Sequence, residues 1–191
     1  MSFLNSVDLS GRATLITGAS GGLGTATAVE FARRGADLVL HGHAQDSGMR
    51  EVVARCEALG ARVTTIVSDL SGPGFDGAEL VDAAVEAESG LDIFVSCAGA
   101  HIDLPFLDMT AERFDRTWRL NVRSGYLIAL ALARRWTPMG VAGRMVFVGS
   151  INGDLSEETS TAYDISKAAV HGMVRALCVE LAPRGIRVNG V

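Results

Sequence analysis

Short apolar segments alternate with helix-like segments through the whole sequence, and this alternation constrains the fold more than any other feature. The apolar segments, rich in Val, Ile and Leu, lie at residues 12–17, 37–41, 62–67, 91–96, 144–148 and 186–191. The helix-like segments between them lie at residues 25–34, 49–59, 78–88, 111–136 and 162–181. Strands separated by helices pair in parallel, because each return to the same end of a sheet needs a long crossover. The sequence therefore predicts an α/β fold with a doubly wound parallel sheet, in three layers α/β/α.

Glycine and proline mark the ends of several helical segments. The first segment stops at Gly35, the second at Gly60 and the last before Pro183. Pro138 is expected to end the longest one, because proline breaks a helix interior. No linker or low-complexity tract interrupts the pattern, so residues 1–191 are expected to form a single domain around one core.

Composition and charge exclude several classes of partner. The net charge is -5 and there is no long basic run, so nucleic acid is not an expected partner. The longest apolar run, near residues 126–133, is far too short to span a bilayer, so no membrane contact is expected. Residues 1–8 lack a basic region followed by an apolar stretch, so no secretory signal is expected. Three scattered cysteines, Cys56, Cys97 and Cys178, predict reduced thiols in a cytoplasmic protein without a metal site.

A glycine-rich loop joins the first apolar segment to the first helical one, with the sequence Thr17-Gly18-Ala19-Ser20-Gly21-Gly22-Leu23-Gly24. Its glycines let the backbone turn tightly and approach a pyrophosphate, whose charge is met by the helix N-terminus. The GxxxGxG pattern alone is weak evidence, and its position between a strand and a helix strengthens it. No Gly-Lys-Ser/Thr follows the loop, which disfavours ATP.

Tyr163 and Lys167 lie four residues apart, thirteen residues after Ser150. Residues at i and i+4 share one face of a helix, so the ammonium can lie beside the phenol. A free tyrosine, with a pKa of about 10, is a poor acid–base catalyst at neutral pH. A cation roughly 4 Å from a phenol, at an effective dielectric constant of about 20, stabilises the phenolate by about 4 kcal/mol. The pair therefore indicates proton transfer in an oxidoreductase.

With these motifs in order, the chain resembles the short-chain dehydrogenase/reductase family over essentially its whole length. Two further motifs carry the resemblance: Asp69 in Val67-Ser68-Asp69-Leu70, and Asn121 in Leu120-Asn121-Val122. The resemblance implies the Rossmann fold and a hydride transfer between NAD(P) and an alcohol or ketone. The implied catalytic residues are Asn121, Ser150, Tyr163 and Lys167. The expected cofactor-binding residues are Gly18, Ser20, Gly21, Gly22, Leu23, Gly24, His43, Asp69, Leu70, Ala98 and Gly99, together with Asn121, Tyr163 and Lys167.

The resemblance also implies a role for each catalytic residue. Tyr163 gives or takes the proton on the substrate oxygen, and Ser150 hydrogen-bonds that oxygen. Lys167 holds the nicotinamide ribose and makes the phenol more acidic. Asn121 positions a water that links Lys167 to solvent.

Two departures from the family pattern lie after the fourth apolar segment. The usual Asn-Asn-Ala-Gly is Ser96-Cys97-Ala98-Gly99 here. Ala98 and Gly99 still permit close approach of a cofactor, and Cys97 is interpreted as a small packed residue. His101 either lines the substrate entrance or is an ordinary loop histidine.

The residues after the second apolar segment favour NADP over NAD. NAD-selective relatives commonly carry a carboxylate near Gly42 that binds the ribose hydroxyls and repels a 2′-phosphate. This chain has no acid there, and His43 takes a position suited to a 2′-phosphate. Gly21 occupies a position where NADP-selective relatives often have a second cation, which weakens the signal.

The substrate side of the sequence is less informative. Residues 151–158 are polar and acidic, which suits a hydroxylated substrate, or an ordinary solvated loop. Sugars, polyols, small ketones and steroids all remain open. Relatives continue beyond the position of Val191 into a substrate-covering loop, another helix and a seventh strand, so a longer native chain is the favoured interpretation.

Two other function classes remain open at this point. One is a catalytically silent NAD(P)-binding module, although binding alone requires neither Tyr163 nor Ser150. The other is an epimerase or dehydratase that retains its cofactor through each turnover. The family also implies a homodimer or homotetramer built from the helices at 111–136 and 162–181, whose apolar side chains also suit ordinary core packing.

Overall fold

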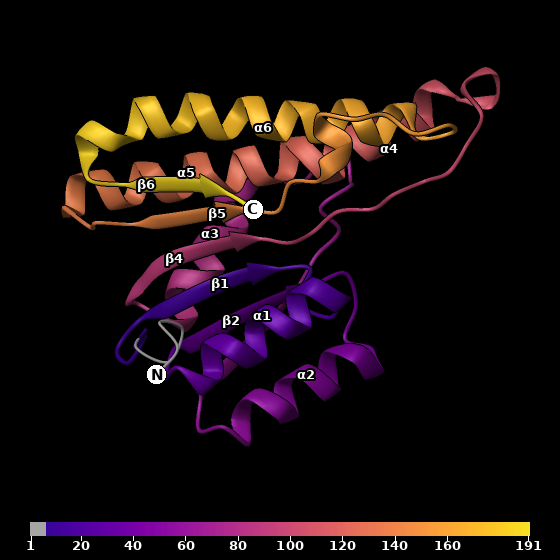
Figure 1. Cartoon of the computed structure of the whole chain (residues 1–191). Coiled ribbons are helices and arrows are strands. Elements are labelled where there is room, and N and C mark those ends of the chain that lie inside the picture. Colours follow the sequence, from indigo (N-terminus) through magenta and orange to yellow (C-terminus); the bar gives the residue numbers. More distant parts are fainter. Residues whose placement is uncertain (1–6) are drawn as a thin grey trace.

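The computed structural model describes residues 7–191 and has a parallel sheet of six strands between two layers of helices (Figure 1). The strands are β1 (Ala13–Thr17), β2 (Asp37–Gly42), β3 (Val63–Val67), β4 (Leu91–Ser96), β5 (Arg144–Phe147) and β6 (Arg187–Gly190). They lie in the order β3-β2-β1-β4-β5-β6, which confirms the predicted doubly wound α/β class. The expectation about a secretory signal falls largely on residues 1–6, which lie outside the described residues.

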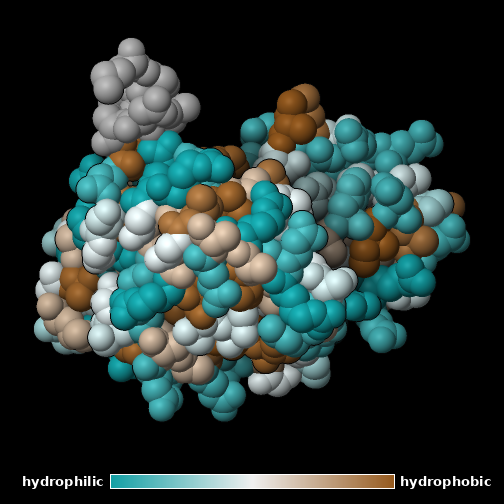
Figure 2. Space-filling view, turned by 90° about the horizontal axis from the view of Figure 1, so that it is seen from below, coloured by the Kyte–Doolittle hydropathy of each residue, from teal (hydrophilic) through white to brown (hydrophobic). Residues whose placement is uncertain are grey.

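The helices divide between the two faces of the sheet. On one face lie α1 (Gly22–Arg33) and α2 (Ser47–Glu57), and on the other lie α3 (Gly77–Ala87), α5 (Ser124–Met139) and α6 (Thr161–Leu181). The shorter helical segments are η2 (Phe106–Asp108), α4 (Ala111–Trp118), η3 (Arg119–Arg123), η4 (Ile151–Gly153) and η5 (Ala182–Arg184). Figure 2 views the molecule from the side of α2, where hydrophobic residues form small patches among hydrophilic ones.

Strands buried on both faces explain why the apolar segments are nearly continuous. Successive strand side chains point to opposite faces, so Leu15 and Ile16 both have no exposed surface yet belong to different cores. Leu15 packs in the core beneath α3 and α5, and Ile16 packs in the core beneath α1 and α2.

The prediction of one long helix at 111–136 is wrong in two respects. It is divided into α4, the π-helical turn η3 and α5, and α5 continues through Pro138 to Met139. Proline is tolerated here because only one residue of the helix follows it, so the lost N–H disturbs a single bond near the end. The chain then turns at Gly140 with a φ of 66°.

The strand order places a switch point between β1 and β4. The chain leaves β1 toward β2 on one side and leaves β4 toward β5 on the other, so the connections diverge at the carboxyl ends of these two strands. Ligands of open α/β sheets bind in the crevice that this divergence creates. None of the helices within residues 7–191 is long and apolar enough to cross a membrane.

Candidate active site

The glycine-rich loop lies at the switch point and leads into α1. Gly18 follows β1 with a φ of 67°, a conformation that favours glycine. A Cβ on Gly18 would lie 2.8 Å from the backbone Cα of Ala98, after β4, so no side chain fits between the two loops. The first turn of α1 has no acidic residue, which leaves its N–H groups open to an anion.

Two other glycines of the loop have different surroundings. A Cβ on Gly24 would collide with the carbonyl oxygen of Gly18, so Gly24 is required for the turn itself. A Cβ on Gly22 would have no atom within 4 Å, so this position faces open space at the helix N-terminus. Leu23, which was expected to bind the cofactor, is 65% exposed beside it. The loop therefore presents an open, uncharged cradle of the kind that fits a pyrophosphate.

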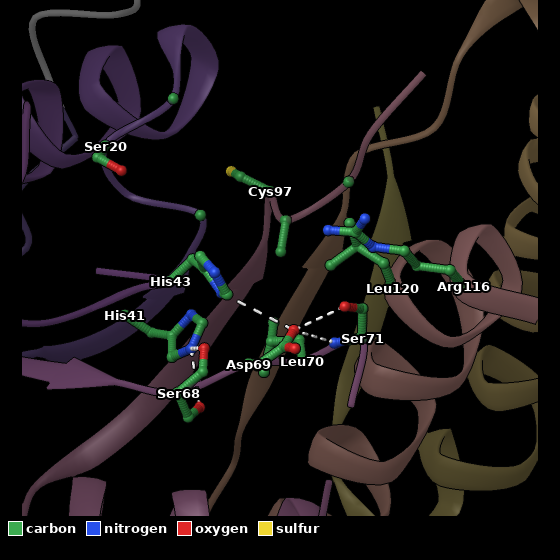
Figure 3. Close-up of a pocket in the computed structure, with 14 residues that line it drawn as sticks. Ser20, His41, His43, Ser68, Asp69, Leu70, Ser71, Cys97, Arg116 and Leu120 are labelled. Carbon is green, nitrogen blue, oxygen red and sulfur yellow. Dashed lines mark hydrogen bonds and ion pairs between the residues drawn. The ribbon is translucent and has the colours of Figure 1, made fainter. Parts of the chain in front are cut away.

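A pocket of about 280 Å³ extends from the loop along the carboxyl ends of β2, β3 and β4. Its lining residues, shown in Figure 3, come from five separate parts of the chain. The lining residues are Gly18, Ser20, Gly21, His41, His43, Ser68, Asp69, Leu70, Ser71, Cys97, Ala98, Gly99, Arg116 and Leu120. Seven expected cofactor or catalytic residues do not line it: Gly22, Leu23, Gly24, Asn121, Ser150, Tyr163 and Lys167.

Asp69 is a fixed carboxylate in this pocket. Its Oδ1 accepts hydrogen bonds from the backbone N–H of Ser71 at 2.8 Å and from the Ser71 hydroxyl at 2.7 Å. These bonds, chiefly that from the hydroxyl, hold the pKa of Asp69 below its usual value. His43 Nδ1 lies 3.8 Å from the same oxygen (Figure 3). Asp69 is therefore an ionised hydrogen-bond acceptor at neutral pH.

Arg116 of α4 also lines the pocket, and sequence reasoning missed it. Within residues 7–191 its guanidinium makes no hydrogen bond or ion pair, and Figure 3 shows it on the other side of Asp69 from His43. Its spacing in the sequence could have indicated this position. Arg116 lies four residues before Leu120, on the same helix face, and both residues line the pocket. An unpaired guanidinium in a nucleotide-sized pocket suits a base or a phosphate.

Asn121 joins the loop after β4 to α6. Its Oδ1 accepts a hydrogen bond from the Ala100 N–H at 2.9 Å, and its Nδ2 donates to the Ala100 carbonyl at 2.9 Å. Nδ2 also donates to the Ser166 hydroxyl at 3.0 Å. The side chain projects from the π-helical turn η3, a distortion that is common at functional sites.

Tyr163 and Lys167 lie one turn apart on α6, as the spacing predicts. Lys167 is 6% exposed, and its Nζ donates a hydrogen bond of 2.9 Å to the carbonyl of Val148. Nζ is 5.6 Å from the centroid of the Tyr163 ring, and 3.8 Å from where a Cβ on Gly99 would lie. Burial lowers the pKa of Lys167. Gly99 is thus the point where the pocket comes near the Lys167 ammonium.

Ser150 follows β5 and caps the short helix η4. Its Oγ accepts a hydrogen bond of 3.2 Å from the Asn152 N–H. The Asn152 amide donates in turn to Asp164 of α6 at 3.0 Å, which ties this turn to the helix that carries Tyr163. Burial works to raise the pKa of Asp164, but hydrogen bonds led by that from Asn152 bring it below its usual value.

Cys97 lies in the pocket wall. It is half-buried, and burial raises the pKa of its thiol, as suits a packed residue better than a nucleophile. Among residues 7–191 no group of three or more His, Cys, Asp or Glu side chains has the geometry to hold a metal ion.

Comparisons with known proteins agree with this geometry. A family model described as short chain dehydrogenase matches residues 12–191. The chain is 34% identical over 183 residues to an L-rhamnose 1-dehydrogenase (NAD(P)(+)) of Sphingomonas sp., covering 96% of this chain and 72% of that protein. It is also 34% identical over 183 residues to a glucose 1-dehydrogenase of Gluconobacter oxydans, covering 95% and 68%.

A solved structure gives the same result. The crystal structure of a short-chain type dehydrogenase/reductase from Mycobacterium marinum superposes with a TM-score of 0.90 at 34% identity, covering 100% of this chain and 77% of that one. The match includes the glycine loop, the six-stranded sheet and the helix that carries Tyr163 and Lys167, because it spans the whole chain. The chain belongs to the short-chain dehydrogenase family of NAD(P)-dependent oxidoreductases.

Proposed function

We propose that the chain exchanges a hydride between NADP and a compact hydroxylated substrate, with Tyr163 as the acid–base residue. The observation that carries this proposal is the fixed, buried ammonium of Lys167 beside the Tyr163 ring, next to Gly99 at the end of the pocket. A bound nicotinamide supplies the hydride chemistry, and the chain supplies the proton.

Lys167 has the donors for two tasks. An ammonium has three N–H donors, and one of them is bound to the Val148 carbonyl. The remaining two are free to meet ribose hydroxyls and to stabilise a phenolate on Tyr163. Because burial destabilises the charged ammonium, the hydroxyls of a ligand replace water as its partners.

Ser150 and Asn121 would support this chemistry from two sides. The Ser150 hydroxyl accepts a hydrogen bond of 3.2 Å from the Asn152 N–H and donates a long one, of 3.4 Å, to Asn152 Oδ1. A substrate oxygen would replace this long bond as the acceptor of the hydroxyl hydrogen. Asn121 uses its whole amide on Ala100 and Ser166, so it fixes the loop after β4 against α6. Its expected role with a water molecule stays a prediction.

The first prediction concerns Tyr163. Tyr163→Phe keeps the ring and removes the transferable proton, so turnover is expected to fall by about 100-fold or more. The dissociation constant for NADPH, measured by fluorescence titration, is expected to change little. Near-normal turnover in this variant would exclude Tyr163 as the acid–base residue.

NADP is proposed over NAD because no carboxylate lies at the end of β2 near Gly42, and His43 is exposed there at the pocket edge. His43→Asp introduces a charge that repels a 2′-phosphate. The ratio of the NADPH to the NADH dissociation constant is expected to rise about tenfold, equivalent to about 1.4 kcal/mol. His43→Asn is the uncharged control and should change the ratio less. A ratio unaffected by Asp would remove His43 from cofactor selection.

Arg116 is proposed to bind the adenine side of the cofactor, which NAD and NADP share. Arg116→Ala is therefore expected to raise the dissociation constants for NADPH and NADH by similar factors. A selective loss of NADPH would instead assign Arg116 to the 2′-phosphate.

The substrate class is proposed from two observations. The segment after Ser150 is polar and acidic, and both curated relatives described above are named as sugar dehydrogenases. A panel of aldoses, polyols, small ketones and a steroid, assayed with NADP and NAD, tests the proposal. Consumption of free cofactor in stoichiometric amounts with a sugar supports it, whereas turnover of steroids alone would contradict it.

A cytoplasmic location is proposed from the three scattered cysteines, all of them free thiols in the structure. Cell fractionation of the tagged chain tests it, and recovery in a secreted or membrane fraction would contradict it.

A further inference from the structure

His101 lies directly on the proposed catalytic tyrosine. The centroids of the His101 and Tyr163 rings are 4.3 Å apart and the ring planes differ by 24°, which is a stacked pair. His101 belongs to the loop after β4, and Tyr163 belongs to α6, so tertiary structure brings together two residues far apart in the sequence.

The imidazole is held in place by polar contacts. His101 Nε2 lies 2.8 Å from the hydroxyl of Ser160, which is buried, and 3.3 Å from a carboxylate oxygen of Asp103. Ser160 precedes α6 and Asp103 belongs to the same loop as His101. These contacts engage Nε2 with Ser160 and Asp103 and so restrict the orientation of the ring.

The loop itself is anchored on both sides of His101. On one side, the Asn121 amide forms two hydrogen bonds of 2.9 Å with the backbone of Ala100. On the other side, the Leu104 N–H donates a 2.8 Å hydrogen bond to the carbonyl of Thr159. Thr159 has a φ of 65°, an uncommon conformation for threonine that tertiary contacts must maintain. The path of the loop over Tyr163 is thus fixed at both ends.

We propose that His101 is a positioning residue for Tyr163: its anchored ring stacks on the phenol ring and fixes the direction of the hydroxyl. The proposal rests on the proposed role of Tyr163 in proton transfer. A half-buried tyrosine can rotate about two side-chain bonds, and proton transfer requires it to hold one of these orientations. Stacking restricts the ring plane without occupying the hydroxyl, which remains available to the substrate.

Three substitutions separate the stack from the polar contacts. His101→Phe keeps an aromatic ring and loses the bonds to Ser160 and Asp103. His101→Asn keeps a short polar group and loses the stack, and His101→Ala loses both. Leu107→Ala is the control, because Leu107 is on the same loop and is 93% exposed.

The first measurement does not depend on turnover. The chain has two tyrosines, Tyr126 and Tyr163, so ring-labelled tyrosine gives two sets of NMR signals that Tyr126→Phe assigns. In the unmodified chain the Tyr163 signals should carry the upfield ring-current shift of a stacked neighbour. His101→Ala and His101→Asn should remove that shift, and His101→Phe and Leu107→Ala should keep a shift of the same sign. Identical Tyr163 signals with and without His101 would overturn the proposal.

The second measurement uses the sugar oxidised best in the panel above. His101→Ala and His101→Asn should lower kcat about 3- to 10-fold, the range that the energy of one aromatic pair allows. The KM for NADP should stay within about twofold. His101→Phe should recover part of the rate, because it keeps the stack and loses the polar anchors. A stack seen by NMR with kcat unchanged in His101→Ala overturns the positioning role and leaves the proposed function intact. Undiminished turnover in Tyr163→Phe overturns the proposed function instead.

Discussion

His41 shows how burial at a single position sets a charge state. It is the last but one residue of β2, lines the pocket and is 2% exposed, with Nε2 3.1 Å from the Ser68 carbonyl and 3.0 Å from the Ser68 hydroxyl. Burial lowers the pKa of His41 to about 4. The folded protein therefore keeps this imidazole neutral at a pH where an unfolded chain would protonate it.

The pH dependence of stability follows from this difference. Below about pH 6.5 the unfolded state gains a proton at His41, and the folded state gains one only near pH 4. The free energy of unfolding should therefore fall as the pH drops through this window, by roughly 3 kcal/mol in total from His41. Glutamine does not titrate, so His41→Gln should lose this part of the dependence of the unfolding free energy on pH. Urea unfolding at pH 7 and pH 4.5 measures the change in unfolding free energy for each protein. An equal change in both proteins would show that His41 makes no such contribution.

The relative positions of side chains were predictable where they depend on local spacing. Tyr163 and Lys167 share a helix face because they lie four residues apart, and the structure places the ammonium 5.6 Å from the ring centroid. The His101 stack and the position of Arg116 were not predictable in this way. Each depends on a segment crossing another element, and no local pattern specifies such a crossing.

At the scale of elements, the loop between β1 and α1 needs glycine for two separate reasons: to form the turn and to leave space for a pyrophosphate. Gly24→Ala would place a methyl group against the Gly18 carbonyl, so the turn cannot form and the chain is expected to unfold or lose several degrees of Tm. Gly22→Ala has open space around it and should fold with a nearly unchanged Tm. Its methyl group projects where a pyrophosphate would approach, so NADPH binding should weaken. Thermal denaturation measures the Tm of both variants, and fluorescence titration measures their affinity for NADPH. An unchanged Tm in Gly24→Ala would contradict the first expectation, and an unchanged NADPH affinity in Gly22→Ala would contradict the second.

The π-helical turn η3 shows where element prediction fails. Residues 111–136 have helical character throughout, and neither glycine nor proline lies within the turn at 119–123. The distortion coincides with long-range hydrogen bonds from Asn121 to Ala100 and Ser166. Bonds of this kind form only after the sheet has assembled, so local propensity does not reveal them.

At the scale of the whole molecule, the side chains of α6 that face outward predict an assembly. Val179 is 78% exposed and Ile165 is 51% exposed on this helix. We expect light scattering to give the mass of two or four chains. Val179→Glu should reduce that mass, because a carboxylate is costly in an apolar contact. Leu59→Glu, near the end of α2 on the other face of the sheet, is the matched control and should leave the mass unchanged. A monomeric unmodified chain would contradict this prediction.

The sequence by itself determined the class of the fold, the approximate bounds of all six strands and the family. It could do so because these properties depend on short-range patterns: apolar segments, helical spacing, and glycines at a strand–helix turn. The bounds predicted for β1 through β6 agree with the structure to within one residue at each end.

Tertiary structure alone decided which side chains meet. The order β3-β2-β1-β4-β5-β6 places Gly18 against Ala98, and the packing of α4 and α6 beside this crevice brings Arg116 to Asp69 and His101 to Tyr163. The physical reason is that a contact between distant segments depends on the crossing of whole elements. The energy of such a crossing is distributed over the entire core, so no single motif in the sequence records it.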